Sequence, residues 1–137
     1  FNLSADTGSN YNVTKTTTVF DAYHRENDAS TGLNYLASQD IAQGTGFQNL
    51  TPEVGLGEDN DASYSGKLFI FNPSSTTFVK HFMWTSNHMS YYSTPWSINS
   101  FIAGYANTTS AIDAIQFKMS SGNIDAGTFK LYGIKDS

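Results

Sequence analysis

The amino-acid sequence predicts an all-β protein, built as an antiparallel β-sandwich of the jelly-roll type. Short apolar or β-branched runs recur at intervals of roughly 8 to 12 residues, as they do in sandwich domains. The segments between these runs are rich in Ser, Thr, Asn and Gly, which favour turns, and helical periodicity is almost absent. The 137 residues fit one domain, residues 1–137.

The first half of the chain predicts two strands and a long loop. Residues 13–23, VTKTTTVFDAY, are enriched in β-branched side chains and predict the first strand. Residues 33–36 predict a second, shorter strand. The segment 37–43 tolerates a helix, although it is too short to be stable as one alone. Residues 51–64 are the longest irregular stretch and predict a surface loop.

The middle of the chain predicts further strands, the first two separated by a turn at Pro73. Residues 67–71, KLFIF, are apolar without alternation, which predicts a strand covered on both faces. Residues 76–85 alternate instead and predict a half-buried strand. Its faces would carry Phe78, Lys80, Phe82 and Trp84 on one side and Val79, His81 and Met83 on the other. Residues 86–100 predict an aromatic loop, and residues 101–105 predict another strand.

The last part of the chain, residues 112–134, predicts a β-hairpin. Ile115, Phe117 and Met119 would point to one side, with the polar residues between them on the other. The sequence Ser-Ser-Gly-Asn then breaks the run, and alternation resumes at residues 129–131. The chain is therefore expected to end inside a sheet.

Charge and composition exclude several classes of protein. A net charge of −5 without a Lys/Arg stripe repels phosphate, so nucleic acid is not expected as a partner. The absence of cysteine excludes disulfides, thiolate-bound metals and thiol catalysis. No apolar run approaches the roughly 20 residues that a membrane helix needs, so no membrane partner is expected. The chain begins at Phe1, which suggests a processed product or an excised fragment.

No catalytic arrangement is recognisable, so the sequence predicts a protein that is not an enzyme and needs no cofactor. His24, His81 and His88 belong to no nucleophile or metal motif. A glycosidase would need two carboxyl groups a few ångströms apart, which spacing along the chain cannot identify. Such a pair would have to come from Asp21, Glu26, Asp40, Glu53, Glu58 or Asp113. Most of these acids lie in predicted turns, where solvated surface groups are expected.

The segment Asp59-Asn60-Asp61 places oxygen ligands at alternate positions, as calcium loops do. It lacks the following glycine and the distal glutamate of an EF-hand. No metal site is therefore predicted, and the question of calcium at Asp59 and Asp61 stays open.

The candidate binding residues lie around the predicted aromatic loop. Trp84, Tyr91, Tyr92 and Trp96 are surrounded by Ser, Thr and Asn. Flat apolar rings beside hydrogen-bonding groups suit a glycan or a neighbouring protein. The alternative is that these rings fill the end of the sandwich, and it is favoured because large aromatic side chains are normally buried.

Two segments carry a resemblance to a known class of proteins. Residues 65–77, SGKLFIFNPSSTT, and residues 112–134, with the ending SSGN...GT..LYGI, resemble C-terminal regions of small bacteriophage virion proteins. These include fibre-associated and head-decorating β-domains, and residues 30–40 match them loosely. The resemblance implies a structural or adhesive role without an active site.

The sequence thus predicts a non-enzymatic virion structural protein, exposed on the particle surface as a head decoration, fibre or tail-fibre component. Its expected partners are copies of itself, as a homotrimer or another symmetric oligomer, other virion proteins and host surface polysaccharide. The first alternative is a free, lectin-like carbohydrate-binding module. A weaker alternative is a fragment of a polysaccharide depolymerase.

Overall fold

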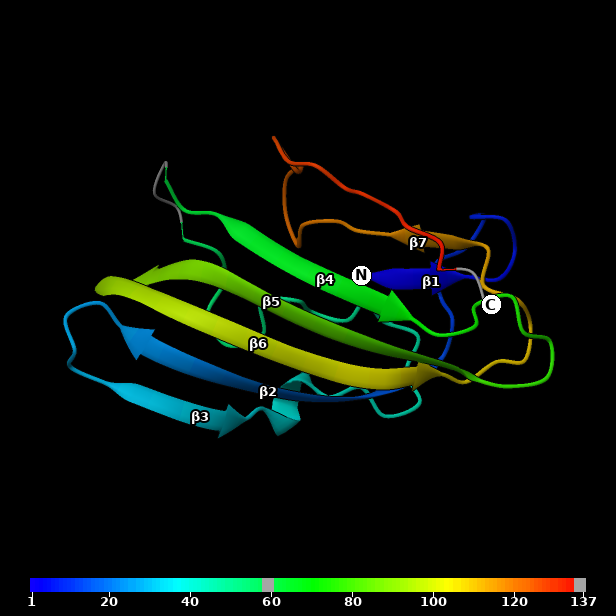
Figure 1. The fold of residues 1–137 in the computed structure, drawn as a ribbon, viewed down its shortest axis with the longest axis horizontal. Coiled ribbons are helices and arrows are strands. Elements are labelled where there is room, and N and C mark those ends of the chain that lie inside the picture. Colours follow the sequence, from blue (N-terminus) through cyan, green and yellow to red (C-terminus); the bar gives the residue numbers. More distant parts are fainter. Residues whose placement is uncertain (58–60, 135–137) are drawn as a thin grey trace.

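A computed structural model describes residues 1–57 and 61–134 and shows an all-β protein (Figure 1). Within these residues the chain forms seven strands and one short 3-10 helix, and no helix is long and apolar enough to cross a membrane. The elements are β1 Asn2–Ser4, β2 Lys15–Arg25, β3 Thr31–Tyr35, η1 Ala37–Gln39, β4 Tyr64–Ile70, β5 Lys80–Tyr92, β6 Thr94–Ala106 and β7 Ala114–Gln116. The predicted fold class, a β-sandwich, is confirmed.

Two antiparallel sheets pack against each other. The larger sheet has the strand order β3-β2-β6-β5-β4, and the smaller one pairs β1 with β7 (Figure 1). Phe1 and Leu3 of the smaller sheet are buried against Phe82 of β5 and Ala106 of β6. We call the face of the large sheet that carries Phe82 the inner face and the opposite one the outer face. The small sheet covers one end of the inner face.

Strands β5 and β6 form one long hairpin, in which Tyr92 pairs with Thr94 across Ser93. Ser93 has φ 67°, the left-handed conformation that a tight turn uses. The prediction of a loop over residues 86–100 is therefore wrong. The period of two continues through this region, but the buried positions in its β5 part are polar, namely Ser86, His88 and Ser90. A strand whose inward side chains are small and polar resembles a loop in sequence.

The strand predicted over residues 76–85 is confirmed from Lys80 onward, where Phe82 and Trp84 are buried and Met83 is exposed. Its first part is wrong, since β5 begins only at Lys80 and Phe78 is exposed before it. The prediction that residues 67–71 are covered on both faces is wrong. Strand β4 is an edge strand with one neighbour, β5, and its Phe69 remains half exposed.

The predicted C-terminal hairpin is also wrong. Strand β7 has three residues and pairs with β1, with Ile115 opposite Leu3. Residues 117–134 contain no strand, and the side chain of Leu131 is 95% exposed. The pairing of β7 with the buried strand β1 replaces the local partner that the sequence suggested. The described chain therefore ends outside the sheets.

Candidate binding surface

The two tryptophans of the predicted binding group lie in the core. Trp84, 7% exposed, packs with Val19 and Ile102 on the inner face. Trp96, 8% exposed, lies 4.9 Å from the ring of Tyr23, and the guanidinium of Arg25 sits 4.2 Å from the Trp96 ring centroid. Neither indole is available to a glycan in this structure.

The two tyrosines of the predicted binding group do not form a common surface with the tryptophans. Tyr91 is half exposed and belongs to the outward-facing positions of β5. Tyr92 lies at the hairpin end of β5, and its side chain is outside the described part of the structure. Because residues at even and odd positions of β5 face opposite sides, Trp84 and Tyr91 cannot contact one ligand together. The structure therefore does not assemble the predicted group.

The outer face of the large sheet is the feature that the sequence analysis missed. No strand or helix among residues 1–57 and 61–134 packs over it, and its large apolar side chains are exposed. The strand register places these side chains next to one another. Tyr35 of β3, Phe20 of β2 and Phe101 of β6, for example, form one row across the sheet. The rings of Phe20 and Phe101 stack with centroids 4.8 Å apart. An exposed apolar surface of this kind marks a contact site more often than an isolated side chain does.

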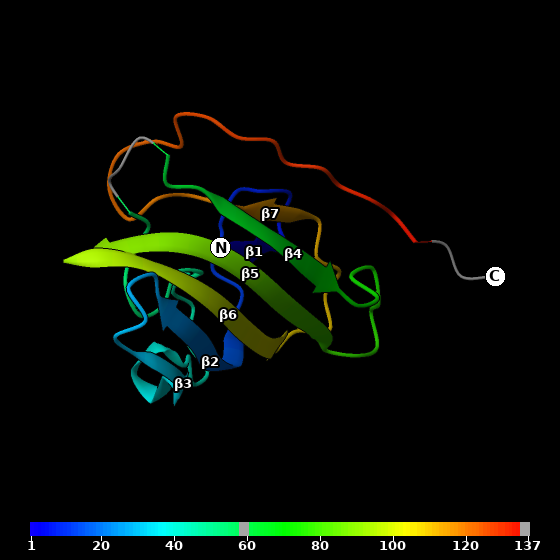
Figure 2. The ribbon, with the colours of Figure 1, turned by 60° about the vertical axis from the view of Figure 1, so that its left-hand side comes forward.

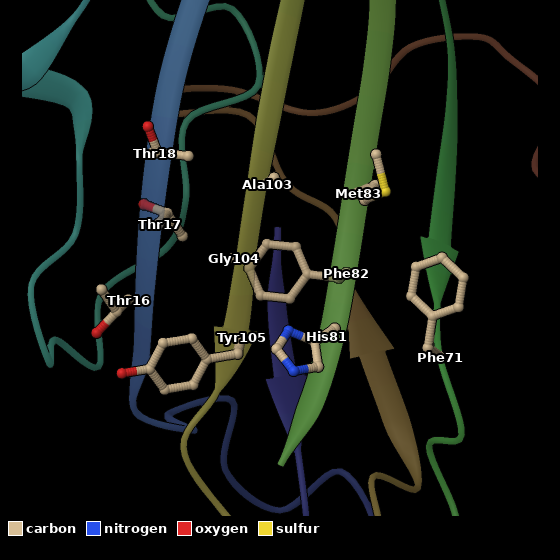
Figure 3. Close-up of a pocket in the computed structure, with 10 residues that line it drawn as sticks. All are labelled: Thr16, Thr17, Thr18, Phe71, His81, Phe82, Met83, Ala103, Gly104 and Tyr105. Carbon is tan, nitrogen blue, oxygen red and sulfur yellow. The ribbon is translucent and has the colours of Figure 1, made fainter.

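A first hollow on this face lies near the start of β5 and has a volume of about 460 Å³. Figure 3 shows the rings of Tyr105, His81 and Phe71 in a row along one end of it. The rings of His81 and Tyr105 are 6.1 Å apart, and the Tyr105 hydroxyl accepts a hydrogen bond from Gln43 at 3.2 Å. Beyond this row Ala103 leaves the floor low, because its side chain is a single methyl group.

A second hollow of about 480 Å³ lies over β4, β5 and β6. Phe69 supplies an apolar ring, and Asn87 and Asn99 supply amide groups. The Asn87 amide donates to Ser97 Oγ and to the Ile98 carbonyl, both at 3.1 Å, which fixes its orientation. Aromatic rings beside fixed amides can hold a sugar ring or a protein side chain. Since no carboxylate lines either hollow, neither offers a paired acid and base.

On the inner face, the structure brings together two of the acids considered for glycoside hydrolysis. Asn34 Nδ2 donates to Asp21 Oδ1 at 3.4 Å and to Glu53 Oε1 at 3.3 Å. Burial, and then the hydrogen bond and the negative charge of Glu53, raise the pKa of Asp21 to about 7. Asp21 is fully buried, however, so this pair does not face a cleft that could admit a sugar.

On the same inner face, residues 54–55 of the segment that follows η1 are held against the sheet. Ser90 Oγ donates to the Gly55 carbonyl at 2.7 Å, and His88 Nε2 lies 3.3 Å from the Val54 carbonyl. Burial lowers the pKa of His88, which favours the neutral ring. The polar inward positions of β5 therefore act as anchors for this segment.

The three histidines do not converge. His88 lies on the inner face, His81 is on the outer face, and His24 is exposed on β2 with its Nε2 3.0 Å from Asp28 Oδ1. Among the described residues no group of three or more His, Asp or Glu side chains could hold a metal ion. Asp59 of the possible calcium loop lies outside the described residues.

Comparisons of this chain with known protein families, with curated proteins and with solved structures found no match. The outer face is therefore defined by the geometry of this chain alone. Its exposed aromatic rows, with two shallow hollows and few charges, suit contact with another surface.

Proposed function

We propose that this protein is a non-enzymatic structural protein of a bacteriophage virion surface, a head decoration, fibre or tail-fibre component. It assembles with copies of itself and with neighbouring virion proteins through the outer face of the five-stranded sheet. The observation that carries this proposal is the uncovered apolar outer face. The resemblance of residues 65–77 and 112–134 to phage virion proteins supports the virion setting.

Energetics favour association through this face. Burying one large apolar side chain contributes about 1.5 to 3 kcal/mol, and the face exposes several, among them Leu33, Tyr35 and Met83. On a particle the same contact repeats by symmetry, so weak individual contacts add up. A soluble monomer would gain nothing from keeping these side chains in water.

Light scattering over a range of protein concentrations tests the self-assembly. We expect wild-type protein to associate, and the double variant Leu33→Lys/Met83→Lys to shift toward monomer with an unchanged melting temperature. Phe78→Lys is the matched control, because Phe78 is exposed but lies before β5, outside the sheet. Wild-type protein that stays monomeric at every concentration, together with its absence from purified source particles by mass spectrometry, would refute the proposal.

Glycan attachment is a second candidate, favoured by the second hollow. Phe69 and Asn99 both line it, and a ring together with an amide suits a sugar. On an array of bacterial surface polysaccharides we expect binding that Phe69→Ala and Asn99→Ala abolish without loss of stability. Leu33→Ala, outside the hollow, should bind as wild type does. Equal binding by all three variants would remove this candidate.

A further inference from the structure

Residues 117–134, which follow β7, form an extended strand-like segment that joins neither sheet. Figures 1 and 2 show it running past the β4 side of the molecule, and in Figure 2 it leaves the body. Residues 117–134 make no backbone–backbone hydrogen bond with any other described residue. One ring anchors this segment, since the centroid of Phe129 lies 5.0 Å from that of Phe117.

The arm, defined here as residues 128–134, has the composition of a β-strand. Its sequence TFKLYGI is rich in aromatic and aliphatic residues with high strand propensity. Most of its large side chains are exposed, in particular Leu131, Tyr132 and Ile134. An extended apolar segment with unpaired backbone groups is a template for pairing with another strand.

Strand β4 offers a matching edge. It has 7 residues and is hydrogen-bonded to β5 on one side, and its other side has no backbone partner among the described residues. The edge carries one charge, Lys67, and ends in apolar residues. Phe69 and Phe71 stack with centroids 6.5 Å apart and are half exposed. It therefore lacks the prolines and repeated charges that normally protect a sheet edge. The opposite edge, β3, is shorter, with 5 residues.

We propose that residues 128–134 add as a strand to the free edge of β4 in a second copy of this chain. Each copy then donates one arm and accepts one, which closes a symmetric oligomer. This inference deepens the proposed self-assembly and rests on it. The large side chains of one arm and of the β4 edge would bury roughly 1,000 Å² over the two chains, which meets the minimum expected of a biological interface.

Cross-linking tests the contact directly, because the chain has no cysteine of its own. Chains with Leu131→Cys and chains with Phe69→Cys are mixed, one of them isotope-labelled, and treated with a short bismaleimide reagent. We expect heterodimers containing one labelled and one unlabelled chain. Asp28→Cys replaces Phe69→Cys in the control mixture, because Asp28 is exposed in the turn between β2 and β3, at the opposite side of the sheet from β4. That mixture should give only background heterodimer.

A second measurement separates this inference from the wider proposal. Leu131→Glu should raise the dissociation constant of the oligomer by about tenfold or more, while Ile124→Glu, exposed but outside the arm, should not. Oligomers that persist unchanged in Leu131→Glu would overturn the arm exchange and leave self-assembly through the outer face standing. Closure of a Phe69→Cys/Leu131→Cys chain onto itself, without heterodimers in the mixture, would likewise assign the arm to its own β4.

Discussion

The indole of Trp84 lies directly over Gly66 on the inner face of the large sheet. A Cβ atom at Gly66 would be 2.6 Å from Cζ2 of Trp84 and 3.0 Å from the Cβ of Ser86. The same relationship recurs at the other edge of the sheet, where a Cβ at Gly32 would lie 2.7 Å from the ring of Tyr23. On both edge strands an aromatic ring from the neighbouring strand thus covers a glycine, which helps to fix the register of the two strands.

The substitution Gly66→Ala should destabilise the protein by about 1 to 3 kcal/mol, because the indole must move to make room for a methyl group. Urea unfolding followed by tryptophan fluorescence measures this change. The control is Gly46→Ala, since nothing lies within 4 Å of a Cβ at that position. Equal stability of the two variants would show that the indole does not pack on Gly66.

Trp96→Ala should lower the free energy of unfolding by about 3 to 5 kcal/mol, as expected for a buried indole. Its ring contacts Tyr23 and Arg25, and both contacts are lost with it. Tyr91→Ala, on the exposed side of the same hairpin, should cost less than about 1 kcal/mol. A stable Trp96→Ala variant that loses glycan binding would instead restore Trp96 as a binding residue.

Asp21 should make the protein less stable as the pH rises from about 4 to about 7. The pKa of Asp21 is raised from 3.8 to about 7 in the folded protein, so the folded state holds a proton that the unfolded state has released. Its contribution is fully present below about pH 4 and is lost by about pH 7. We therefore expect Asp21→Asn to be more stable than wild type at pH 8 by about 1 kcal/mol or more.

The substitution Asp28→Asn, at an exposed position, serves as the control for this experiment. Differences in the free energy of unfolding between variant and wild type, measured from pH 4 to 8, isolate the effect. An Asp21→Asn difference that does not change with pH would contradict the raised pKa.

His88 should make the protein less stable as the pH falls, the opposite of the effect of Asp21. Its pKa is lowered by burial, so below about pH 6.5 the unfolded state binds a proton that the folded state resists. Stability is lost as the pH falls through this range. We expect His88→Gln to reduce that loss, measured by the change in urea midpoint between pH 7 and pH 5. An equal loss of stability between pH 7 and pH 5 in both proteins would show that another group titrates.

Much of the fold could be predicted from the sequence, because the strands that carry apolar side chains inward have a period of two. Residues 80–85 are an example. Residues 13–23 were predicted from their β-branched side chains instead, and their buried positions include Lys15 and Asp21. The second half of β5 could not be predicted in this way. Its inward residues Ser86, His88 and Ser90 are polar, and they pack against a loop rather than a second sheet. Their burial depends on that distant segment, which local alternation does not reveal.

The candidate surface was predicted less well. The four aromatic residues were chosen for their composition, but strand alternation sends Trp84 and Tyr91 to opposite faces. The outer face draws its residues from all five strands, and their proximity follows from the register alone. A signal was present in the sequence, since odd positions of β5 such as Met83 would alternate with the buried ones. This signal could be interpreted only with the knowledge that no second layer among the described residues covers the outer face.

The pairing of β1 with β7 has a consequence for how the chain is made. Asn2 pairs with Gln116, and β2 pairs with β6 from Lys15↔Ala106 to Arg25↔Trp96. On the ribosome, β1 must therefore wait for most of the chain before it finds its partner, and β2, which can pair early with β3, must wait as long for β6 on its other side. Strands β5 and β6, in contrast, can close as soon as both have emerged. We expect this hairpin to nucleate folding, and the newborn N-terminal strands to be the part that most needs chaperone protection.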